Sequence, residues 1–175
     1  MGTKFSAVYD CFLGKITDDM YMELTPEDTL RDLQVLLIDA IPGFEFPRKN
    51  INNYTIAIAA PIENDLNTID YINNDNSFFE VDLTQEEINI LATLMMNGWL
   101  QRQVTSIENI RMKYSGSDFK FTSQANHLAK LLILLTECQR QSHHLQRLYK
   151  RRKTDGEGNI SSNWSIFGKT NARND

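Results

Sequence analysis

Cysteine is scarce in this 175-residue sequence, which contains only Cys11 and Cys138. Two thiols are too few for the disulfide framework of a small secreted domain, so a reducing compartment is the expected setting. Glycine and proline number only 8 and 4, which leaves an ordinary globular composition with 41% hydrophobic residues. A chain of this length can bury a core without disulfides or metal, and one domain is expected.

The sequence also lacks a long hydrophobic run. Its most apolar window, Leu128 to Leu135, contains Lys130 and is far shorter than the roughly 20 residues that cross a bilayer. The stretch from Met1 to Tyr9 lacks the basic and apolar regions of a secretory signal. We therefore expect no membrane insertion and no membrane partner.

Sequence motifs for catalysis and cofactor binding are missing. We find no P-loop, no Gly-x-Gly-x-x-Gly, no His-Glu-x-x-His and no Gly-x-Ser-x-Gly. His127, Cys138, His143 and His144 lie in one region, but their spacing does not place two metal ligands three or four positions apart. We expect no enzyme, no cofactor and no metal site.

Charge is distributed unevenly along the chain. Residues 1–90 carry 17 acidic and 5 basic side chains, a net charge of −12, whereas residues 91–175 carry 6 acidic and 13 basic ones, a net charge of +7. Opposite charges at opposite ends of a folded subunit favour head-to-tail contact with copies of itself or with a partner of complementary sign. The alternative is that the charges coat two solvated faces.

Two helices are predicted in the N-terminal half. Lys4 to Leu13 carries apolar residues at three- and four-residue steps, and Gly14 is expected to end this helix in the left-handed conformation. Thr25 is the predicted N-cap of the next helix, which ends at Pro42 and Gly43.

Two long helices are predicted in the second half. Thr84 to Glu87 fits a capping box, and the helix that follows reaches Met112 or Tyr114. The last helix begins near Thr122 and continues to Arg152, a length of about 45 Å. We expect its basic end to project from the body. Its predicted apolar stripe comprises Leu128, Leu131, Leu132, Leu135, Cys138, Ser142, Leu145 and Tyr149.

Residues 44–83 are predicted to form an inserted arm between the helices. Phe44 to Arg48 and Phe78 to Leu83 are the two most strand-like pieces. The stretch between them, Lys49 to Ser77, contains eight asparagines and suits loops and turns, and within it Tyr54 to Ile58 has the alternation of a small strand. Such an arm is either a tolerated surface insertion or an interaction element.

Beyond Lys153 the composition is typical of an extended tail, residues 154–175. Thr154 to Asn159 has the composition of a flexible link, and Trp164, Ile166 and Phe167 follow it. Three large apolar side chains need burial, either against the protein's own core or as anchors on another protein. The reach of the link favours docking on a partner.

The strongest charged feature is the run Arg147, Lys150, Arg151, Arg152 and Lys153. These cations suit the negative C-terminal pole of a helix, which is a structural reason for their presence. They could also neutralise phosphates or contact an acidic partner. Because the rest of the chain is acidic and base-reading motifs are missing, sequence-specific DNA binding is the minor interpretation.

An ordered set of segments resembles one class of viral protein: Ile16 to Tyr21, Thr25 to Asp28, Ala40 to Arg48, Leu83 to Ile88, Trp99-Leu100, Met112 to Asn126 and Tyr149 to Lys153. In these segments the chain is similar to small virion proteins of tailed bacteriophages, and it resembles their head-to-tail connector (adaptor, or neck ring) proteins. Crass-like gut phages are one source that the resemblance suggests. It covers most of residues 4–167.

The resemblance implies a mainly α fold: a helical bundle over residues 1–153, with a small β-hairpin and the Asn-rich arm 44–83, and an extended C-terminal tail over residues 154–175. It implies a structural subunit that repeats in a ring of roughly twelve copies. The ring lies in the virion neck between capsid and tail, is assembled in the host cytoplasm, and performs no catalytic turnover.

The partners that the resemblance implies are further copies of the chain, the portal protein and other neck or tail ring proteins. Genomic double-stranded DNA passes through the channel without specific recognition. Trp164, Ile166 and Phe167 are then the anchors on the portal, and the cations from Arg147 to Lys153 lie near an acidic portal surface. The alternative function is a DNA-binding accessory or packaging protein that uses the basic end of the last helix.

Overall fold

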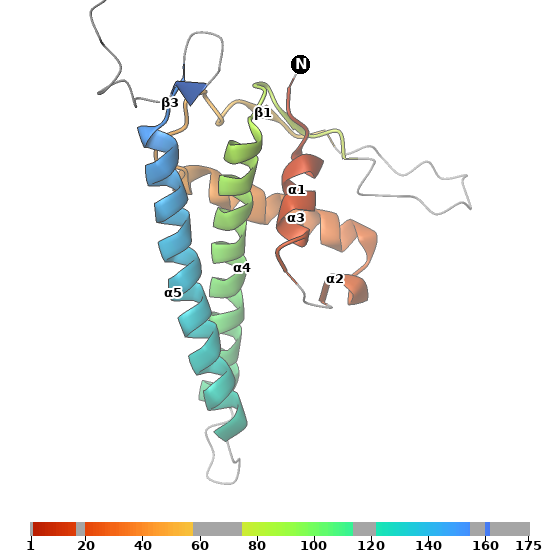
Figure 1. The fold of residues 1–175 in the computed structure, drawn as a ribbon. Coiled ribbons are helices and arrows are strands. Elements are labelled where there is room, and N and C mark those ends of the chain that lie inside the picture. The colour runs from red at the N-terminus through yellow and green to blue at the C-terminus, as the bar shows by residue number, and fades with distance from the viewer. Residues whose placement is uncertain (1, 17–19, 58–74, 114–121, 155–159, 162–175) are drawn as a thin grey trace, which may run out of the picture.

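The fold is mainly helical, as the sequence predicts, with a small antiparallel hairpin (Figure 1). The computed structural model describes residues 2–16, 20–57, 75–113, 122–154 and 160–161. The helices are α1 (Phe5–Leu13), α2 (Met20–Glu23), α3 (Pro26–Ala40), the 3-10 turn η1 (Ile41–Gly43), α4 (Gln85–Lys113) and α5 (Thr122–Arg151). The strands are β1 (Tyr54–Thr55), β2 (Phe78–Phe79), β3 (Lys153–Thr154) and β4 (Ile160–Ser161).

Helix α4 is the central element. It packs against α1 and α3 on one side and against the antiparallel α5 on the other (Figure 1). The C-terminal part of α4 and the N-terminal part of α5 extend together beyond the other helices. The molecule is therefore a small helical body with a long helical hairpin that projects from it.

Helix α1 forms as predicted and supplies the centre of the core. Phe5, Val8, Tyr9 and Phe12 are all fully buried, as their three- and four-residue spacing requires. The predicted left-handed Gly14 is wrong, since its φ is −66°. The Gly14 N–H instead makes an ordinary helical hydrogen bond to the Asp10 carbonyl at 3.0 Å. The chain then tightens, because the Lys15 N–H donates to the Phe12 carbonyl at 2.9 Å, so no left-handed residue is needed to satisfy these carbonyls.

The predicted caps of α3 and α4 are confirmed. The Thr25 hydroxyl accepts a hydrogen bond from the Asp28 N–H at 3.1 Å. At the start of α4, the Thr84 N–H donates to the Glu87 carboxylate at 2.7 Å, and the Glu87 N–H donates to the Thr84 hydroxyl at 3.3 Å. Both helix starts are thus fixed by their own local sequence.

The strand predictions are half right. Tyr54–Thr55 pairs with Phe78–Phe79 in the antiparallel hairpin β1–β2, with Tyr54 opposite Phe79. Phe44 to Arg48 was predicted as a strand and is not one. This segment instead follows the C-terminal end of α5, where α5 side chains take the place of a neighbouring strand as hydrogen-bond partners.

The orientation of α5 corrects another expectation. Its basic end was expected to project, but that end lies against the body, where Arg152 pairs with Glu86 at the start of α4. The opposite end of α5 projects (Figure 1). The predicted apolar stripe is buried at Leu128, Leu135 and Cys138, whereas Leu132 is 42% exposed and lies off the stripe.

Three predictions fall on residues outside the described ranges. They concern the turn at 114–118, the middle of the Asn-rich arm at 58–74, and the tail anchors Trp164, Ile166 and Phe167. At the start of the tail, β3 and β4 pair antiparallel, which the sequence did not indicate. Among the helices that the structure describes, none combines the length and apolar character of a membrane span.

Candidate partner interface at the basic end of α5

The predicted basic cluster lies where three parts of the chain meet: the C-terminal end of α5, the first turn of α4, and residues 44–48, which we call the strap. Gln146 of α5, only 2% exposed, holds the strap and the last residue of η1 through both ends of its amide. Its Oε1 accepts from the Glu45 N–H at 2.8 Å, and its Nε2 donates to the Gly43 carbonyl at 3.2 Å. A buried side-chain amide thus replaces a strand partner for the strap.

Tyr149 is the buried centre of this junction, with 1% of its surface exposed. Its hydroxyl donates to the Glu87 carboxylate and accepts from the Arg48 N–H at 3.3 Å. Its ring packs edge-on against Phe44, with centroids 5.4 Å apart. Burial, followed by the hydrogen bond and charge of Glu87, raises the pKa of Tyr149 above its ordinary range.

Arg48 of the strap caps the C-terminal end of α5. Its guanidinium donates to the Tyr149 carbonyl at 2.9 Å and to the Arg152 carbonyl at 2.6 Å, and it lies 4.3 Å above the centre of the Tyr149 ring. The last carbonyls of a helix lack partners within the helix and carry its negative pole, so a cation there is favourable. The strap therefore supplies the charge that neutralises this helix end.

Two of the predicted interface cations are used by the protein's own fold. Arg152 forms an ion pair of 2.9 Å with Glu86, and the Lys150 ammonium lies 3.8 Å from the centre of the Phe46 ring. Phe46 itself is 40% exposed. Lys150 and Phe46 together form an exposed cation and aromatic pair on the strap side of the helix end.

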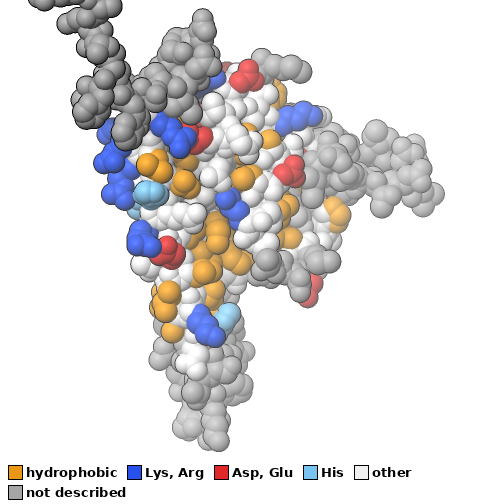
Figure 2. Space-filling view, in the orientation of Figure 1, with side chains coloured by type: hydrophobic (Ala, Val, Ile, Leu, Met, Phe, Trp, Pro, Cys, Tyr) orange, Lys and Arg blue, Asp and Glu red, His pale blue; other side chains and the backbone are white. Residues whose placement is uncertain are grey.

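The other predicted cations are accessible. Arg147 and Arg151 are exposed, and neither forms an ion pair with any residue in the described ranges. Figure 2 shows Lys and Arg side chains gathered at this end of α5. Lys153 is the first residue of β3, but the structure does not describe its side chain. Trp164, Ile166 and Phe167 lie outside the described residues. Of the predicted partner-binding residues that the structure describes, Arg152 is held in an ion pair and Lys150 contacts the Phe46 ring, whereas Arg147 and Arg151 have neither kind of contact with a described residue.

Arg48, Phe46 and Gln146 complete the site and were not predicted from the sequence. Pro47 offered a signal, because proline cannot donate to a strand ladder and so argues against a strand at Phe44 to Arg48. A second signal came from Gln146, which lies three positions before Tyr149 of the predicted apolar stripe. The polar groups of both side chains require hydrogen-bond partners when they are buried.

Two further titratable side chains lie near the site among the described residues. His143 Nδ1 lies 3.6 Å from the Glu45 carboxylate at an exposed position. Cys138 is buried, its thiol lies 3.8 Å from the Thr93 carbonyl, and burial raises its pKa. A buried thiol of this kind is inert. Within the described residues, no group of three or more His, Cys, Asp or Glu side chains could hold a metal ion.

The arrangement of the described side chains suits the binding of anionic groups. Two accessible guanidinium groups and an exposed aromatic ring suit an acidic protein surface or phosphate groups. Comparisons of the chain with protein-family models, curated proteins and solved structures found no match.

Proposed function

We propose that this protein is a virion structural protein: a subunit of the head-to-tail connector (neck or adaptor) ring that joins the portal to the tail and lets genomic DNA pass. Its partners are further copies of itself, the portal protein and neighbouring neck or tail rings. The residues proposed to contact the portal are Arg147, Lys150, Arg151, Arg152, Lys153, Trp164, Ile166 and Phe167. The proposal begins from the sequence resemblance described above.

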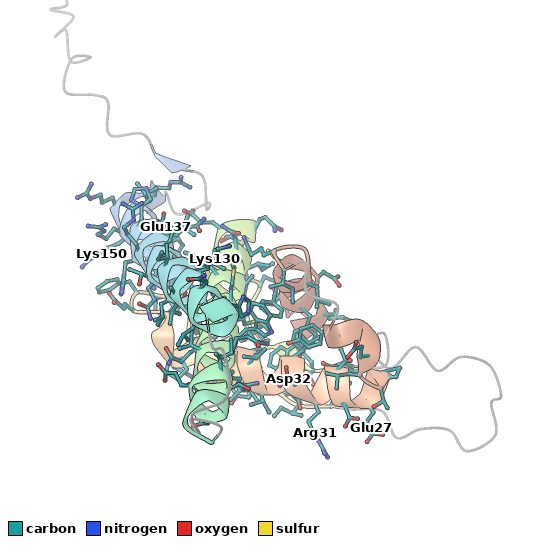
Figure 3. The ribbon with its side chains drawn as sticks, turned by 90° about the horizontal axis from the view of Figure 1, so that it is seen from below. Glu27, Arg31, Asp32, Lys130, Glu137 and Lys150 are labelled. Carbon is teal, nitrogen blue, oxygen red and sulfur yellow. The ribbon has the colours of Figure 1, made fainter. Side chains whose placement is uncertain are left out.

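The observation that carries the proposal is the opposite charge of the two outer helices. Helix α3 contains four acidic residues and one basic residue, whereas α5 contains five basic residues and one acidic residue. They lie on opposite sides of α4, as the labelled charges in Figure 3 show. A subunit with an acidic flank and a basic flank can contact identical neighbours on both sides, as a ring requires.

The elongated shape gives further support. The α4–α5 hairpin extends beyond the body, while the basic end of α5 is held rigidly by Tyr149, Gln146 and Arg48. A fixed cluster of cations presents a defined surface to an acidic partner at little entropic cost. The exposed Arg147 and Arg151 are therefore suited to portal binding.

Pull-down by isolated portal rings encoded in the same genome tests this role. Deletion of residues 162–175, or the substitution Arg151→Glu, is expected to abolish or strongly weaken binding. Lys4→Glu makes the same change of charge at an exposed site on the opposite end of the chain and should bind normally. Binding that survives both the deletion and Arg151→Glu would contradict the proposed portal contact.

A DNA-binding accessory or packaging protein is the second candidate, and the exposed Arg147 and Arg151 favour it. A gel-shift titration with double-stranded DNA at several salt concentrations separates the two functions. A DNA-binding protein should retard the duplex at low salt and release it as salt rises. The connector proposal predicts no retardation, since the chain carries a net charge of −5.

A further inference from the structure

The face of α5 that points away from α4 carries a straight row of basic side chains in its C-terminal part. The basic row consists of four exposed residues, Arg140, His144, Arg147 and Arg151. Their steps of four, three and four positions keep them within an arc of about 60° and along about 16 Å of helix. Figure 2 shows Lys, Arg and His side chains gathered along this part of α5.

The opposite face of α5 is the one that α4 covers. Cys138, Ser142 and Tyr149 are all less than 5% exposed, and each contacts a residue of α4 through a hydrogen bond or a close approach to a carbonyl. At 3.6 residues per turn, the basic row lies about half a turn around the helix from these side chains. The row therefore faces outward, where a partner can reach it.

The fold itself makes little use of the row. Arg140 pairs with Glu137 at 2.8 Å, but these side chains are 75% and 59% exposed, and a surface pair of this kind adds little stability. Glu137 is also the one acidic residue of α5, so the helix carries no acidic side chain from residue 138 to its end. His144, Arg147 and Arg151 form no ion pair with a residue in the described ranges.

The negative pole of α5 does not explain the row either. The field of a helix end falls off within its last turn, which contains Arg151 alone of the four residues. Arg48 already donates to the carbonyls of Tyr149 and Arg152 at that end. The positions of Arg140, His144 and Arg147 thus serve no contact within the part of the chain that the structure describes, beyond the exposed pair with Glu137.

The spacing of the row specifies the shape of its partner. Guanidinium groups bind carboxylates through paired hydrogen bonds. An α-helix repeats the side chains of one face at the same steps of three and four positions, whereas a strand repeats them every two positions, about 6.6 Å apart. Because the order four, three, four reads the same in both directions, an acidic helix laid beside α5 matches it whether parallel or antiparallel.

A nucleic acid duplex matches the row less well. The phosphates of each strand wind around the duplex, so a straight row of cations meets only some of them. The chain also has a net charge of −5, which repels a long polyanion more strongly than it repels one short acidic helix. Charge complementarity and spacing together favour a protein helix.

We infer that the basic row binds an acidic α-helix of a partner protein, whose carboxylates recur at steps of four, three and four positions and lie beside the outer face of α5. Interhelical ion pairs of this kind fix the register and choice of partner. The inference deepens the proposed function and rests on it for the identity of the partner, which is the portal.

A pair of synthetic helical peptides tests the inference on the full chain. The matched peptide carries four glutamates at steps of four, three and four positions, and the scrambled peptide has the same composition with its glutamates spread around the helix. In fluorescence anisotropy titrations, the matched peptide should bind at least about tenfold more tightly than the scrambled one. A short DNA duplex in the same assay should bind more weakly than the matched peptide.

Substitutions on α5 show where the matched peptide binds. Arg147→Glu and Arg151→Glu should each weaken its binding by about tenfold or more. Lys130→Glu is the matched control, because Lys130 is exposed on the same helix and undergoes the same change of charge about 15 Å before the row begins, so its effect should stay below about threefold. Circular dichroism checks that the variants stay folded, as their exposed positions predict.

Three results would overturn the inference. Equal affinity for the two peptides, or an equal loss in all three variants, would reveal attraction between charges without recognition of a helix. Tighter binding of the DNA duplex than of the matched peptide would assign the row to nucleic acid. A matched peptide that does not bind would show that the row does not recognise an acidic helix.

The portal pull-down described above separates this inference from the proposed function. If portal rings capture the wild-type chain but not Arg151→Glu, while the matched peptide fails to bind, the inference is wrong and the proposed function stands. If the matched peptide binds as expected but portal rings do not capture the chain, the proposed function is wrong and the recognition of an acidic helix stands.

Discussion

The Tyr149 hydroxyl is the most informative single group to remove. It lies in a buried junction, where it donates to the Glu87 carboxylate and accepts from the Arg48 N–H. Glu87 is 2% exposed, and its other carboxylate oxygen is already bonded to the Thr84 N–H and hydroxyl at 2.7 and 2.9 Å. In Tyr149→Phe, the Glu87 oxygen that faces the ring loses its donor.

The expected loss of stability follows from this geometry. A hydrogen bond to a charged group contributes about 1.5–3 kcal/mol, and an unsatisfied buried carboxylate oxygen places this case in the upper half of that range. Because the ring itself is retained, no large cavity term adds to it. We expect Tyr149→Phe to lower the free energy of unfolding by about 2–3 kcal/mol and Tm by about 5–10 °C.

Urea unfolding followed by circular dichroism measures the effect, with the midpoint shifting while the m-value stays constant. Tyr54→Phe is the matched control: Tyr54 is half-buried and makes ring contacts with Phe5 and Phe79, so loss of its hydroxyl should change stability by less than about 0.5 kcal/mol. A double-mutant cycle with Glu87→Gln should show coupling between the two side chains. If Tyr149→Phe were as stable as the wild type, the junction would not depend on this hydrogen bond.

Three further predictions test other parts of the fold. Burial raises the pKa of Tyr9 and Tyr149 above the ordinary value of about 10, so the stability from their protonated forms is present below that pH and lost above it. Above pH 10 the free energy of unfolding should therefore fall by up to about 1.4 kcal/mol per pH unit for each of the two tyrosines. Tyr9→Phe and Tyr149→Phe should each remove the contribution of one tyrosine to this pH dependence, as measured by urea unfolding at several alkaline pH values. Thr25→Ala removes the α3 cap and should cost about 1 kcal/mol in urea unfolding, whereas Thr25→Ser should restore most of it. Phe79→Ala empties a fully buried position and should cost about 3–5 kcal/mol, with Phe79→Leu losing less; equal stabilities would show that the β2 ring does not belong to the core.

The helices were predictable because their signals are local. Thr25 and the pair Thr84 and Glu87 form caps within four residues of sequence, and the buried face of α1 follows from its own spacing. A pattern of this kind specifies structure without knowledge of the rest of the chain. The ends of α3, α4 and α5 were therefore predicted to within a few residues.

The errors concern contacts between distant parts of the chain. Arg48 binds the end of α5 about a hundred positions away in the sequence. The sequence of the strap does not indicate which distant residues it contacts. Leu132 fits a helical stripe as well as Leu131 does, and only the position of α4 decides which of them is covered. The direction in which α5 projects depends in the same way on Glu86 and Glu87, which belong to another helix.

The most direct test of the connector proposal is an image of the intact phage particle at a resolution that traces this chain. The account predicts copies of the chain in a ring between capsid and tail, with the basic end of each α5 against the portal. A particle whose neck contains no copy of this chain would contradict the proposed function.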